Sequence, residues 1–144
     1  NSFKMKIETA IPELEYMVFK YCSDLECDGT SNILSYYLGE IGVSFKSYTG
    51  SVYLGKKKFA PHFWIESGDY IIDFKTKMWL GDKALQGVFH KKELKKSKMS
   101  YMKDSKIDLT AGKLLLKVQQ TKIRHAEEMK EFEAHLNVIS TTKI

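Results

Sequence analysis

Apolar residues recur at intervals of three and four near the start of the chain, and this spacing predicts two helices. The first covers residues 11–21, where Pro12 suits the first turn. The second covers about residues 30–40 and stops at Gly42. The polar segment 23–29 between the two helices is predicted to be a loop.

Short runs of apolar and aromatic residues follow, and they predict strands over residues 43–48, 51–54, 62–66 and 70–74. The last two runs flank residues 67–69, Ser-Gly-Asp, which is a signal for a tight hairpin. Side chains alternate along a strand, so His62, Trp64 and Glu66 are expected on one face of the first strand of this hairpin.

The hydrophobic pattern weakens after residue 75. Trp79 and Leu80 are expected in the core, and Gly81 and Gly87 are expected to interrupt regular structure. Residues 97–105 are polar and are predicted to form a flexible loop. The sequence therefore assigns no strand to this part of the chain.

The last segment carries a long helical pattern. Asp108 or Thr110 can cap a helix that runs to about Val138, which is about 40 Å at 1.5 Å per residue. Such a helix either packs across the body or pairs with a second copy, so a homodimer through it is a candidate assembly. The expected fold is α+β: N-terminal helices packed on a small antiparallel sheet form a core over residues 1–105, and the long C-terminal helix covers residues 106–144.

Lysine carries the net charge of +5, since Arg124 is the only arginine. Lysine runs occur at residues 56–58, 91–92 and 95–96. Such runs can bind nucleic acid or another acidic partner, but a solvated loop or helix face is the favoured interpretation. Arginine is the usual residue for reading phosphates and bases, so nucleic acid is not expected as a partner.

No stretch approaches the roughly 18 apolar residues of a membrane span, and the first residues lack the apolar segment of a signal peptide. We therefore expect a cytoplasmic protein without a membrane partner, in which Cys22 and Cys27 are reduced thiols. No pair of Cys-x-x-Cys motifs and no His-Glu-x-x-His motif occurs, so neither a metal site nor a cofactor is expected.

Three residues in chain order carry the candidate chemistry: Cys27, His62 and Asp73. Cys27 precedes the second predicted helix, and a helix N-terminus and a nearby imidazolium both stabilise a thiolate. His62 would take the thiol proton, and Asp73 would accept a hydrogen bond from the other ring nitrogen. The register between the two strands decides whether Asp73 faces His62, and the sequence leaves that register open.

Each of these residues also has a structural interpretation. A lone Cys is often a small core residue, which is how Cys22 is interpreted, and a strand His or Asp can simply satisfy the fold. Glu66 shares the predicted face of His62, so it could replace Asp73 as the orienting carboxylate or line the cleft. The further candidates for the oxyanion hole or the cleft are Tyr21, Asn32, Trp64 and Glu66.

The stretch of residues 27–74 resembles the transglutaminase-like, papain-type cysteine superfamily, in which a Cys helix is followed by a sheet that carries His and Asp. The closest pattern is that of the peptidase domain of lasso-peptide maturation proteins. The residues that carry the resemblance are Cys27, Ser31, Leu34, Leu38, Gly42, Gly50, Ala60, His62, Trp64, Ile65, Glu66 and Asp73. Pro61 stands between Ala60 and His62, where the family has Ala directly before His.

This resemblance implies a papain- or transglutaminase-like core with Cys27 as nucleophile, His62 as base and Asp73 as the orienting residue. It implies acyl chemistry on an amide of a protein or peptide substrate through a thioester. Water resolves the thioester in a peptidase or glutamine deamidase, and an amine resolves it in a transglutaminase. Hydrolysis is favoured because it needs no pocket for a second substrate. The alternative function is a catalytically inactive fold of this kind that binds protein or nucleic acid.

Overall fold

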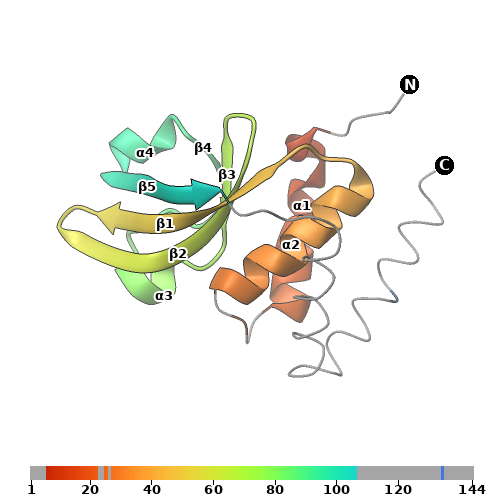
Figure 1. The fold of residues 1–144 in the computed structure, drawn as a ribbon, viewed down its shortest axis with the longest axis horizontal. Coiled ribbons are helices and arrows are strands. Elements are labelled where there is room, and N and C mark those ends of the chain that lie inside the picture. The colour runs from red at the N-terminus through yellow and green to blue at the C-terminus, as the bar shows by residue number, and fades with distance from the viewer. Residues whose placement is uncertain (1–5, 23–24, 26, 107–133, 135–144) are drawn as a thin grey trace.

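The computed structural model describes residues 6–22, 25, 27–106 and 134, and their fold is α+β (Figure 1). Two N-terminal helices precede an antiparallel sheet, as the sequence predicts. The sheet has five strands, and the last two lie after residue 75, where the sequence predicts none. The long C-terminal helix predicted from the sequence lies outside the described residues. The elements are α1 (Ile7–Tyr21), α2 (Cys27–Ile41), β1 (Lys46–Leu54), β2 (Lys57–Ser67), β3 (Tyr70–Asp73), α3 (Lys77–Leu80), β4 (Gly87–His90), α4 (Glu93–Lys96) and β5 (Met99–Lys106).

Helix α1 begins one turn before its predicted start. Ile7 and Ala10 extend the buried stripe that continues with Leu14 and Met17, and all four side chains are at most 5% exposed. Pro12 therefore lies inside the helix instead of in its first turn. Burial of the whole stripe outweighs the one backbone hydrogen bond that a proline cannot donate.

Helix α2 also begins earlier than predicted, at Cys27 instead of near residue 30. Its buried residues Ile33, Leu34 and Leu38 recur at helical spacing and form a core with α1 and the sheet. Cys27 is thus the first residue of a helix of 15 residues, so residues 27–29 are helical and the loop predicted for them is wrong.

The sheet has the order β4-β3-β2-β1-β5. β1 continues through Thr49 and Gly50, where the sequence predicts a break between two strands. Gly50 is needed there because a Cβ on it would overlap the backbone carbonyl of Met102 on β5. The loop predicted over residues 97–105 is wrong, since β5 pairs with β1 along this segment.

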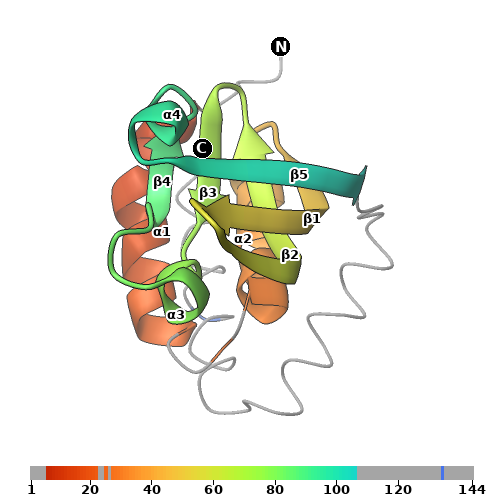
Figure 2. The same cartoon turned by 90° about the vertical axis from the view of Figure 1, so that its left-hand side faces the viewer.

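The two faces of the sheet differ. Ile65 and Ile72 lie on the face that packs against α1 and α2, while Trp64, Ile71 and Phe89 form a separate cluster on the opposite face. In Figure 2 the sheet curls so that β5 crosses over β3 and β4 on this second face. Side chains from strands that are not neighbours in the sheet therefore meet on the inside of the curl.

The segment between β3 and β4 tests two further predictions. Leu80 is buried, as expected, but Trp79 is 37% exposed and stacks on Phe59 with ring centroids 4.1 Å apart. The prediction that Trp79 lies in the core is therefore wrong. Gly81 and Gly87 both have positive φ. Gly81 directly follows α3 and Gly87 begins β4, so both mark the boundary of a regular element, as predicted. Within the described part of the chain, no helix combines the length and apolarity that crossing a bilayer requires.

Candidate functional site

His62 on β2 and Asp73 at the end of β3 are hydrogen-bonded, with Nε2 2.7 Å from Oδ2. Their side chains are 0% and 1% exposed. Ile65 pairs with Ile72, so the register places Asp73 one step along the same face from His62. The structure therefore supplies the register that the sequence leaves open, and it joins these two residues.

The hydrogen bond assigns the ring proton of neutral His62 when its partner is a carboxylate. An ionised carboxylate can only accept, so the Nε2–H group donates to Asp73. Nδ1, on the other side of the ring, is then the nitrogen that can take a proton from a nucleophile. This arrangement is the one that an imidazole needs in order to act as a general base.

Tyr101 on β5 is a third member of this group, and sequence reasoning missed it. Its hydroxyl donates to Oδ2 of Asp73 at 2.7 Å, and the backbone N–H of Lys75 donates to Oδ1 at 3.3 Å. Three strand spacings separate β5 from β3, about 14 Å in a flat sheet, so only the curl of the sheet permits this contact. The signal in the sequence was the alternation of Met99 and Tyr101 with polar Ser100, which is typical of a strand.

The phenol of Tyr101 remains a donor over a wide pH range. Burial raises its pKa well above the ordinary value, and the negative charge of Asp73 acts in the same direction. The carboxylate of Asp73 is therefore held by two side-chain donors, His62 on β2 and Tyr101 on β5. Such a network fixes the position of a buried charge and of the imidazole bonded to it.

Aromatic rings surround the imidazole of His62. Phe59 meets it edge-on at 5.8 Å between centroids, Trp64 stacks at 6.1 Å, and Tyr101 lies at 6.4 Å. These rings exclude water from the His62–Asp73 pair. The electrostatic interaction between the two residues is consequently stronger than it would be in a solvated pair.

Cys27 is the first residue of α2. In Figures 1 and 2 the Cys27 end of α2 lies beside β2, the strand that carries His62. The side chain of Cys27 lies outside the part of the chain that the structure describes. A thiolate at the first position of a 15-residue helix is stabilised by the partial positive charge of the helix N-terminus.

The second cysteine, Cys22, has the opposite character. Its side chain is 0% exposed and belongs to the core formed by α1, α2 and the sheet, as expected from the sequence. Burial raises the pKa of its thiol to about 12, although Lys75 acts in the opposite direction. Cys22 is therefore a neutral core residue at physiological pH.

The remaining candidates for the oxyanion hole or the cleft are Trp64, Asn32 and Tyr21. Trp64 is fully buried and donates its indole N–H to Oε2 of Glu66 at 3.0 Å, so that donor is used inside the fold and does not serve an oxyanion. Asn32 is half-buried within α2, and the side chain of Tyr21 lies outside the described part of the chain.

Glu66 forms a separate charged group. Its Oε1 atom lies 2.8 Å from Nζ of Lys91 and 3.1 Å from Nζ of Lys103. Burial would raise the pKa of Glu66, but the hydrogen bonds from Lys91, Trp64 and Lys103 outweigh it and hold the pKa below the ordinary value. Asp73, rather than Glu66, is thus the carboxylate bonded to His62.

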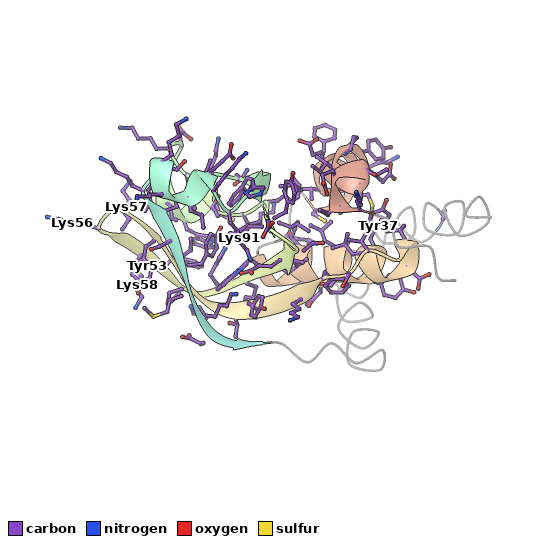
Figure 3. The ribbon with its side chains drawn as sticks, turned by 90° about the horizontal axis from the view of Figure 1, so that it is seen from above. Tyr37, Tyr53, Lys56, Lys57, Lys58 and Lys91 are labelled. Carbon is purple, nitrogen blue, oxygen red and sulfur yellow. The ribbon has the colours of Figure 1, made fainter. Side chains whose placement is uncertain are left out.

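Glu66 lines a cleft whose lining does not include His62 or Asp73, so its predicted place in the cleft of these two residues stays a prediction. The cleft has a volume of about 270 Å³ and lies at the end of the sheet near Lys91, which Figure 3 labels. Trp64 separates Glu66 from His62 along the same strand face, so this cleft and the His62–Asp73 pair are distinct places. The lining residues are Ser44, Phe45, Lys46, Tyr48, Glu66, Gly68, Lys91 and Lys103.

The described residues contain no cluster of three or more His, Cys, Asp and Glu side chains able to hold a metal ion. Comparisons with models of protein families, with curated proteins and with solved structures find no match to this chain. The resemblance to the transglutaminase-like superfamily therefore remains a prediction from the residues themselves.

Proposed function

We propose that the chain is a cysteine-dependent enzyme that performs acyl chemistry on an amide of a protein or peptide substrate. Cys27 is the nucleophile, His62 the general base and Asp73 the residue that orients the imidazole. The observation that carries the proposal is the buried hydrogen bond between His62 and Asp73 on neighbouring strands, beside a helix that begins at Cys27. A nucleophile, a base and an orienting carboxylate are the parts that covalent acyl transfer requires.

The reaction proceeds in two balanced steps. Nδ1 of His62 takes the proton of the Cys27 thiol, and the sulfur attacks the amide carbonyl to form a tetrahedral intermediate. The imidazolium then protonates the nitrogen as the C–N bond breaks, which releases an amine, or ammonia from a glutamine side chain, and leaves a thioester. Water, deprotonated by His62, attacks the thioester and regenerates the thiol and a carboxylic acid.

The hydrogen bonds to Asp73 support this assignment over a purely structural histidine. A buried His that only satisfies the fold needs one partner, whereas here Tyr101 and the Lys75 amide also hold the carboxylate in place. A carboxylate with fixed orientation keeps Nε2 protonated and directs Nδ1 away from the pair. Hydrolysis is preferred to amine transfer because it requires no binding pocket for a second substrate.

The test is the rate at which iodoacetamide alkylates Cys27 as a function of pH, in a Cys22→Ala background. Cys22 is buried in an apolar core, so alanine fits there better than a polar residue and removes the second thiol. We expect a thiolate that titrates well below the ordinary thiol value of about 8.5, because the helix N-terminus and the imidazolium of His62 both stabilise it.

Two variants separate catalysis from structure. His62→Ala should abolish the low thiol pKa, and Asp73→Asn should lower the alkylation rate at neutral pH at least about tenfold by releasing the imidazole. Circular dichroism establishes that each variant is folded before its rate is read. An ordinary thiol titration that neither substitution changes would overturn the proposed function and leave a non-catalytic binding protein.

A further inference from the structure

The fold gathers two lysine-rich segments that the sequence keeps about 35 residues apart. Residues 53–58 contain the end of β1, the turn at residues 55–56 and the start of β2, and residues 92–98 contain α4 and the turn before β5. The backbone N–H of Gly55 donates to the carbonyl of Lys98 at 3.0 Å, and Leu54 pairs with Met99. We call the surface formed by these two segments the lysine end.

The lysine end is strongly and locally positive. It carries seven exposed lysines and one glutamate, Glu93, which gives a net charge of +6, whereas the whole chain has +5. In Figure 3 Lys56, Lys57 and Lys58 project together at the end of the molecule far from Tyr37. The exposed lysines are Lys56, Lys57, Lys58, Lys92, Lys95, Lys96 and Lys98.

Exposed aromatic rings lie among these cations. Lys58 holds its Nζ 5.7 Å from the centroid of the Tyr53 ring. Lys57 donates to the carbonyl of Leu80, which brings α3 and its exposed Trp79 against the same lysine run. Trp79 rests on Phe59 with an interplanar angle of 5°, so its outer surface is a fixed flat platform.

From this juxtaposition we propose that the lysine end binds single-stranded nucleic acid without sequence preference, with lysines on the phosphates and Trp79 stacking on a base. Lysine and aromatic side chains on one surface are the two components of such sites. The described cations outside histidine are all lysines, which bind phosphate as point charges and do not read base edges as arginine does. From sequence alone nucleic acid is not expected, because arginine is nearly absent and lysine runs are typical of a solvated surface. The structure adds that the lysines of residues 56–58 and those of residues 92–98 share one surface.

An acidic protein is the competing partner, and the aromatic platform argues against it. Electrostatic attraction alone would serve a row of carboxylates equally well. A flat ring fixed at the edge of a positive surface adds stacking energy for a partner that presents aromatic bases, which a row of carboxylates lacks. The proposal is also independent of the proposed catalytic function, because the lysine end does not include Cys27, His62 or Asp73.

The test is fluorescence anisotropy of the full chain with a labelled 20-nucleotide oligothymidylate at 50 and 200 mM salt. The variant Lys56→Gln/Lys58→Gln/Lys96→Gln should weaken binding at least tenfold and reduce the salt slope by about 2. The matched control Lys6→Gln/Lys20→Gln/Lys46→Gln removes three exposed lysines elsewhere and should weaken binding much less.

Stacking is tested with Trp79→Ala, which should weaken binding about fivefold or more, against Phe19→Ala on α1, which should not change it. Cys27→Ala should bind like the parent, whatever the outcome of the alkylation experiment. Failure to bind at 50 mM salt, equal losses in the two triple variants, or full competition by polyglutamate at equal charge concentration would each overturn the proposal.

Discussion

The two faces of the sheet are stabilised by different kinds of interaction. The face toward α1 and α2 is closed by aliphatic side chains such as Ile65 and Ile72, both at most 1% exposed. The inner face of the curl is just as well buried around Trp64, but it holds a histidine and two carboxylates. Burial of charge is costly unless each charged group is hydrogen-bonded. The inner face of the curl therefore depends on hydrogen bonds, whereas the face toward the helices depends on the packing of apolar side chains.

Residues that stabilise the aliphatic core and the His62–Asp73 pair of the proposed catalytic site therefore lie on opposite faces of the same sheet. His62 and Ile65 lie on the same strand, yet one points into a polar network and the other into an aliphatic core. Because side chains alternate along β2, neighbouring positions can be changed independently. The predictions below compare the two faces, beginning with the largest effect.

The helix face should respond to loss of volume. Ile65→Ala removes a fully buried aliphatic side chain and should lower the free energy of unfolding by about 2–4 kcal/mol. The measurement is urea denaturation at neutral pH, with Phe19→Ala as control, because Phe19 is 82% exposed and should change stability by less than about 0.5 kcal/mol. The folded fraction of Ile65→Ala should keep the alkylation rate of the parent, and a slowed rate would show that the two faces are coupled.

The inner face should respond to loss of a single donor. Tyr101→Phe keeps the ring but takes one hydrogen bond from buried Asp73, which should cost about 1–2 kcal/mol. Tyr53→Phe, at a partly exposed ring, is the matched control and should cost less than about 0.5 kcal/mol. Equal effects of the two substitutions in urea denaturation would contradict the importance of the contact to Asp73.

The same variant has a distinct pH dependence. The folded state raises the pKa of Tyr101 above the ordinary value of 10, so above pH 10 the unfolded chain releases this proton while the folded chain keeps it. The free energy of unfolding therefore falls as the pH rises through this range. In Tyr101→Phe the free energy of unfolding should therefore fall less steeply than in the parent as the pH rises above 10.

The smallest effect is expected at Glu66, whose lysine partners are 40% and 45% exposed and therefore screened. Glu66→Gln should cost about 1 kcal/mol at pH 7. The folded state lowers the pKa of Glu66, so its contribution is present above the unfolded value of 4.5 and disappears as the pH falls through the lower folded value. Parent and variant should then converge in acid, with exposed Glu93→Gln as control; a difference that persists in acid would contradict this origin.

The sequence was most informative where its pattern was periodic. The stripes of α1 and α2 and the hairpin at residues 68–69 follow from spacing alone, because burial of an apolar face decides those elements. β5 was missed because its residues are mostly polar: it is an edge strand with an exposed outer side, so tertiary pairing with β1 decides its conformation.

The candidate site could also be predicted only in part from the sequence. His62 and Asp73 could be selected from their strand contexts, but their hydrogen bond depends on a register that only the folded sheet provides. Tyr101 lies 28 residues from Asp73 and reaches it across the curl, which no local pattern encodes. The prediction that Trp79 is buried failed for a related reason, since its partner Phe59 belongs to another element.

The close approach of β5 to β1 in the curled sheet depends on Gly50. It lies opposite His62 on β1, and the pairing of β1 with both neighbouring strands becomes irregular beside it. Any side chain there would push against the backbone of β5, the strand that carries Tyr101. A mutational scan would therefore find position 50 as intolerant of substitution as the residues proposed for catalysis, although the requirement at position 50 is purely spatial.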